Sequence, residues 1–146
     1  MSVNNKGFTL VEILLVLSIV SMMTLISLLQ LRPLHDSKKI DQFLHQLQND
    51  LFYSQQYAIS HSEMTKVFFS ETEPFYRIYS GAKNKVILTR TFDESIRFQY
   101  ITLGSTLYFN SNGNVQRSGS IRVKYKGDTY TITFLLGKGR FYVAKL

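Results

Sequence analysis

Glu12 carries the only ionisable side chain in a mainly apolar run that extends over residues 8–31. On insertion scales, a carboxylate in the first turns of a membrane helix costs about 2–3 kcal/mol, so such a group is usually paired with a cation. The nearest cations are Lys6, which precedes the run, and Arg32, which follows it. We therefore expect Glu12 to meet a positive charge from outside its own helix, on another subunit or on a newly made N-terminal amine.

The residues around Glu12 combine glycine, an aromatic residue and glutamate behind a short polar leader: Lys6-Gly7-Phe8-Thr9-Leu10-Val11-Glu12. This pattern resembles the leader junction of type IV pilins and pseudopilins. The resemblance implies that a prepilin peptidase cleaves between Gly7 and Phe8 and N-methylates Phe8. It also implies that Glu12 meets the N-terminal amine of a neighbouring subunit during assembly, a pairing favoured because burying either charge alone is costly.

A second group of candidate residues is basic and aromatic and lies near the C-terminus. Lysine and arginine could neutralise phosphates there, and tyrosine could stack on exposed bases. The candidates for nucleic-acid contact are Lys124, Lys126, Lys138, Arg140, Tyr142 and Lys145. Basic strand edges that resist aggregation are the alternative explanation. The net charge of +7 fits an acidic partner as well as simple solubility.

No catalytic or cofactor-binding pattern is found. Cysteine is absent, which excludes a disulfide framework, thiol catalysis and thiolate metal sites. The three histidines lack metal-ligand spacing. Asp93 and Glu94 are adjacent, so on a strand they would point to opposite faces and could not form a carboxylate pair. We expect a protein that is not an enzyme and needs neither metal nor cofactor.

Two helical segments are expected to carry the N-terminal features. The run 8–31 is long enough to cross a bilayer, which takes about 20 residues, and Arg32-Pro33 should close it. A secretory signal peptide is a rival interpretation, but no small-x-small cleavage site follows the run. A plain signal anchor leaves Glu12 unexplained. An amphipathic helix should then begin near Asp36 or Ser37 and end near residues 61–62, with apolar residues at three- and four-residue steps.

Beyond residue 62 the apolar period changes to two, which is typical of β-strands. Strands are expected at 65–69, 75–79, 85–89, 95–102, 106–110, 121–125, 130–134 and 141–143. The sequence therefore predicts an α+β protein, in which a long N-terminal helix packs on an antiparallel β-sheet head. The expected divisions are a leader (1–7), a transmembrane and filament-core helix (8–31), a stem helix (32–62) and the head (63–146).

Within the pilin family, the glutamine-rich helix and the tail around Gly137 and Gly139 are similar to those of minor pilins of the Gram-positive competence pilus. That similarity implies a single-pass membrane precursor with an extracellular head, later assembled into a surface filament for DNA uptake. The implied partners are other pilins, the prepilin peptidase, the membrane and DNA. The alternatives are a type II secretion pseudopilin and a single-span surface binding protein that never assembles.

Overall fold

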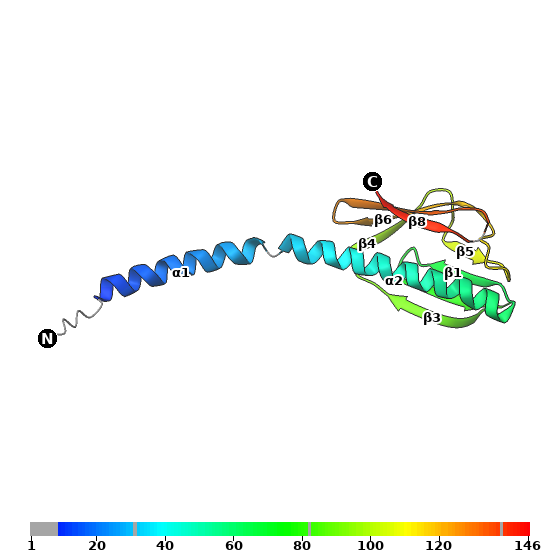
Figure 1. Cartoon of the computed structure of the whole chain (residues 1–146), viewed down its shortest axis with the longest axis horizontal. Helices are drawn as coiled ribbons and strands as arrows, with labels where there is room; N and C mark the ends of the chain where they lie inside the picture. Colours follow the sequence, from blue (N-terminus) through cyan, green and yellow to red (C-terminus); the bar gives the residue numbers. More distant parts are fainter. Residues whose placement is uncertain (1–8, 31, 82, 138) are drawn as a thin grey trace, which may run out of the picture. The chain divides into compact units, whose positions relative to one another are not determined.

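The computed structural model describes residues 9–30, 32–81, 83–137 and 139–146 (Figure 1). The chain divides into two compact units, Met1–Lys39 and Ile40–Leu146. Gly7 and Phe8, the predicted cleavage site, lie outside the described residues, and so does Lys138.

The first unit contains helix α1, Leu10–Gln30, whose described side chains are exposed throughout residues 10–25. Among the residues that the structure describes, no helix is long and apolar enough to cross a membrane. Phe8 and Leu31, the ends of the predicted span, are not among those residues.

Helix α2 runs from Arg32 to His61 and therefore begins earlier than the expected start at Asp36 or Ser37. Pro33 does not prevent this, because the first turn of a helix needs no backbone N–H donors and accepts the fixed φ of proline.

Helix α2 ends at His61, as expected. Ser62 adopts a positive φ of 52°, and the Glu63 N–H donates to the Ala58 carbonyl at 3.1 Å, which satisfies a terminal carbonyl.

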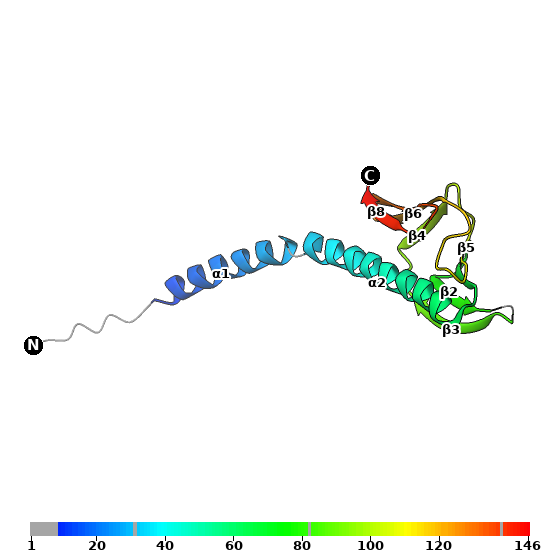
Figure 2. The ribbon, with the colours of Figure 1, turned by 45° about the vertical axis from the view of Figure 1, so that its right-hand side comes forward.

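In the described residues after α2, eight strands form two antiparallel sheets. The first sheet has the order β3-β2-β1-β5, and the second has the order β4-β6-β7-β8. Figure 2 labels β2, β3 and β5 of the first sheet and β4, β6 and β8 of the second. The strands are β1 (Thr65–Phe69), β2 (Phe75–Ser80), β3 (Lys85–Thr91), β4 (Ile96–Tyr100), β5 (Thr106–Phe109), β6 (Gly119–Tyr125), β7 (Asp128–Phe134) and β8 (Phe141–Lys145). The predicted α+β class is confirmed, and the division of the head into two sheets is added.

The core of the second unit joins both sheets to one face of α2. Six residues of α2 at the expected three- and four-residue steps are buried, and their spacing is that of one helix face: Ile40, Leu44, Leu47, Leu51, Ser54 and Ala58. Phe69 and Tyr76 come from the first sheet, and Ile121 and Phe134 come from the second. Burying each such large side chain stabilises the fold by about 1.5–3 kcal/mol.

A buried carboxylate ties α2 to the first sheet. Asp50 on α2 accepts hydrogen bonds from the Tyr76 hydroxyl at 2.7 Å, from Arg90 Nε at 2.9 Å and from Gln46 Nε2 at 3.0 Å. Burial and the bond to Asp50 raise the pKa of Tyr76 above its usual value, and the same carboxylate raises the pKa of Arg90. These bonds fix α2 against β2 and β3, and no local pattern in the sequence predicts them.

Two glycines allow the loops near the end of α2 to approach it closely. Gln55 Nε2 donates to the Gly113 carbonyl at 2.8 Å. Gly139 is buried with a φ of 56°, and a Cβ there would collide with the Gln55 amide and the Gly113 carbonyl oxygen. Glycine is therefore required at position 139 by space as well as by backbone conformation.

Candidate assembly site and basic surface

Thr9 and Glu12 form the start of α1. The backbone N–H of Glu12 donates to Thr9 Oγ1 at 3.3 Å, and the N–H of Ile13 donates to the Thr9 carbonyl at 3.2 Å. Thr9 is thus the N-cap of α1, and Thr9-Leu10-Val11-Glu12 has the spacing of a capping box. Sequence reasoning missed the N-cap at Thr9, although threonine followed three residues later by glutamate is a recognisable signal.

Glu12 lies on an apolar part of α1. It lines a shallow hollow with Ile13, Val16 and Leu17, and the sequence has no cation between residues 9 and 30. A carboxylate at a helix N-terminus is favoured by the helix dipole and by the capping geometry. Both effects are compatible with a further role in meeting a cation from another subunit, because a carboxylate offers several acceptor positions.

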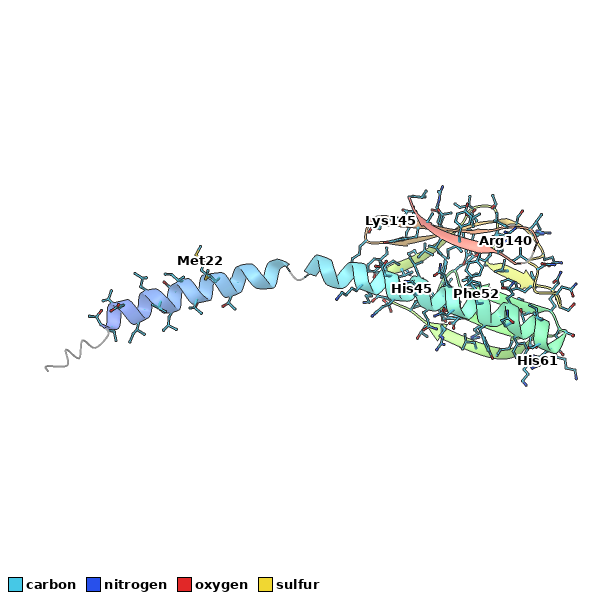
Figure 3. The ribbon with its side chains drawn as sticks, in the orientation of Figure 1. Met22, His45, Phe52, His61, Arg140 and Lys145 are labelled. Atoms are coloured by element: carbon cyan, nitrogen blue, oxygen red, sulfur yellow. The ribbon has the colours of Figure 1, made fainter. Side chains whose placement is uncertain are left out.

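The candidate nucleic-acid contacts that the structure describes do not form one surface. Lys126 lies in the turn between β6 and β7. Lys145 lies at the end of β8, where it is the cross-strand neighbour of Tyr130 on β7. Arg140 directly precedes β8 and therefore lies at the opposite end of that strand from Lys145 (Figure 3). Lys145 Nζ donates to the Asp128 carboxylate at 2.9 Å, and that hydrogen bond raises the pKa of the ammonium group. Lys145 therefore already has an acidic partner within its own sheet.

Lys124 and Tyr142 occupy outward positions of the second sheet, on β6 and β8, and both are exposed. The same face carries Arg97 of β4 and Arg122 of β6, which were missing from the predicted set. The alternation of residues in 96–100 and 121–125 could have placed both arginines opposite the core. Lys138 lies outside the described residues.

The described residues contain no group of three or more histidine, aspartate or glutamate side chains that could hold a metal ion. His61 instead stacks on Tyr57, with ring centroids 3.9 Å apart, near the end of α2. His45 lines an open groove with Asp41, Tyr130 and Lys145.

The chain is similar in fold to two solved structures. The type IV minor pilin FimU of Pseudomonas aeruginosa superposes with a TM-score of 0.63 over 75% of this chain and 90% of its own, at 11% identity. The minor pseudopilin EpsH of the Vibrio cholerae type 2 secretion system gives a TM-score of 0.58 over 73% and 97%, at 13% identity. At these identities the likeness concerns the fold.

Sequence comparison covers the N-terminus and then almost the whole chain. Residues 3–28 match the prokaryotic N-terminal methylation motif. The competence protein ComGD of Bacillus subtilis (strain 168) is 36% identical over 140 residues, which is 96% of this chain and 94% of that protein. Fold and motif together define a type IV pilin-like protein. Within that class, the chain belongs to the family of the competence protein ComGD.

Proposed function

We propose that the protein is a minor subunit of a competence pilus that serves DNA uptake. The observation that carries this proposal is the 36% identity to a competence protein over 96% of the chain, together with the methylation motif at residues 3–28. The work of such a subunit is mechanical and adhesive, and it needs no catalytic group.

The proposed pathway begins with a membrane-held precursor. The apolar run 8–31 serves as its single-pass anchor, with the leader in the cytoplasm and the head outside. Prepilin peptidase then cleaves between Gly7 and Phe8 and methylates the new amine of Phe8. Glu12 meets the amine of a neighbouring pilin, and α1 becomes part of the filament core.

Deletion of the gene for this chain in naturally competent cells tests the proposed function. Without this chain, we expect the cells to lose both assembled pili and the uptake of labelled DNA into a nuclease-resistant form, because a missing subunit interrupts assembly. Reintroduction of the wild-type chain should restore both.

Protein secretion serves as the matched readout for the runner-up function. A defect in secretion with normal DNA uptake would identify a secretion pseudopilin, a class whose fold is represented by EpsH. Normal uptake together with normal pilus content would rule out the competence role and leave a surface protein that does not assemble.

A further inference from the structure

The outer face of the second sheet gathers three cations from neighbouring strands. We name Arg97, Arg122 and Lys124 the basic face. In the strand register Arg97 lies directly opposite Lys124, while Arg122 is two residues from Lys124 and therefore on the same side of the sheet. Cross-strand partners have Cβ atoms about 4.5–5.5 Å apart, and two like charges at that position destabilise a sheet. The arrangement therefore carries an electrostatic cost.

Within the part of the chain that the structure describes, no carboxylate on the same face offsets this cost. The outward positions of the four strands are Arg97, Gln99, Ser120, Arg122, Lys124, Thr129, Thr131, Thr133, Tyr142 and Ala144. By contrast, Arg90 and Lys145 are paired with Asp50 and Asp128. Among the described residues, the cations of the basic face have no such acidic partner.

Two buried polar atoms, one in the basic face and one on the neighbouring strand β7, also lack hydrogen-bond partners within the described part of the chain. Arg122 Nε and Thr131 Oγ1 are buried without a hydrogen bond, and the two residues are paired across β6 and β7. An unsatisfied buried polar group costs about 1–3 kcal/mol, so such groups in a folded protein need an explanation. An anion seated over these strands would draw the guanidinium group and the hydroxyl into hydrogen bonds.

We propose that the basic face binds the phosphate backbone of duplex DNA. This inference rests on the proposed function, which supplies DNA as the polyanion. Each of the three cations can neutralise one phosphate, and the arginine fork matches phosphate oxygens in a bidentate manner. The threonines of β7 add neutral donors of the kind that contact phosphate and sugar. Contacts of this type read the backbone, so binding is independent of base sequence.

The expected salt dependence follows from the number of phosphate contacts. For three contacts to duplex DNA, the slope of log affinity against log salt is about −2.7, or roughly a 40-fold loss between 50 and 200 mM salt. Additional cations elsewhere on the chain steepen this slope. Removing the three charges of the basic face should therefore flatten the slope of log affinity against log salt by about 2.7.

Fluorescence anisotropy of a labelled DNA duplex with the full-length chain in neutral detergent measures this directly. The test variant carries Arg97→Ser, Arg122→Ser and Lys124→Ser. The matched control carries Lys83→Ser, Lys85→Ser and Arg117→Ser, which removes the same charge from exposed positions outside the second sheet. We expect the slope of log affinity against log salt to be flatter by about 2.7 in the test variant than in the wild-type chain. The slope of the control variant should stay close to that of the wild-type chain.

A double variant, Arg97→Ser with Lys124→Ser, leaves the partly buried Arg122 in place and covers the case in which the triple variant does not fold. Its slope should flatten by about 1.8, the share of two phosphate contacts. Unchanged affinity and slope in this folded double variant would overturn the proposal. An equal loss in the control would also overturn it, because net charge alone would then explain binding.

A second arm separates DNA from other phosphodiester chains. A glycerol phosphate polymer that binds the wild-type chain more tightly than the duplex, and loses that binding in the variants, would contradict the assignment to DNA. A separate result tests the proposed function. Normal DNA uptake by cells that lack the chain would contradict the proposed function, independently of which ligands the variants bind. If those cells stop taking up DNA while the variants bind it unchanged, the basic-face proposal alone is wrong.

Discussion

Replacement of Glu12 by glutamine is expected to abolish incorporation of the chain into pili while leaving its processing and membrane insertion intact. Glutamine is nearly the same size as glutamate and is accepted at the same position of a capping box, so the start of α1 at Thr9 keeps its hydrogen bonds. The substitution removes the negative charge alone. A neighbouring N-terminal amine would then be buried without its counter-ion, which is strongly unfavourable in a low-dielectric filament core.

Sheared pilus fractions and membrane fractions, compared by immunoblot, measure the effect. Glu12→Ala removes the charge and the side-chain acceptors, but it keeps the backbone N–H that donates to Thr9 Oγ1, and it should behave like the glutamine variant. Thr9→Ala removes the cap alone and should weaken the helix start by only about 0.5–2 kcal/mol, with much of the assembly retained. If Glu12→Gln assembled normally while Glu12→Ala did not, assembly would require a polar side chain at position 12 and not its negative charge.

Asp50→Ala is expected to destabilise the second unit by about 2–3 kcal/mol, because the buried Tyr76 hydroxyl loses its acceptor and Arg90 loses its bidentate partner. Arg90 is 44% exposed and can turn to water, so the loss stays below that of a fully buried ion pair. For a unit of this size the change corresponds to a Tm lower by about 10–20 °C.

Thermal unfolding of the detergent-solubilised chain, followed by near-ultraviolet circular dichroism, gives the measurement for Asp50. Asp41→Ala makes the same substitution on the same helix at an exposed position and should change stability by less than about 0.5 kcal/mol. Equal Tm values for the two variants would show that the Asp50 hydrogen bonds contribute no net stability.

Features that depend on neighbouring residues were predictable from the sequence. The buried face of α2 follows from apolar spacing, with Ile40, Leu44, Leu47 and Leu51 at steps of three and four. The strands follow from alternation, as in β2, where Tyr76 and Ile78 are buried and Arg77 is not. The methylation motif is read directly from residues close together in the chain.

Features that depend on distant pairing were not predictable. The division into two sheets arises because β1 pairs with β5 and β4 pairs with β6, and neither pair is joined by a short turn. The bond between Asp50 and Arg90 joins residues 40 positions apart. The basic face has the same origin, since Arg97 becomes a neighbour of Lys124 only through the β4–β6 register.

The prediction of where α2 begins was wrong for a different reason. Pro33 was interpreted as a helix breaker, which holds for the interior of a helix but not for its first turn.

The intact mass of the protein recovered from cells that produce the peptidase tests the central claim, that this chain follows the pilin pathway. We predict a mass that matches a chain beginning at methylated Phe8. A Gly7→Val variant, in which the peptidase meets a larger residue at the junction, should retain the full-length mass and serves as the control. A full-length mass for the wild-type chain, with an active peptidase present, would contradict the pilin pathway and leave an ordinary membrane anchor.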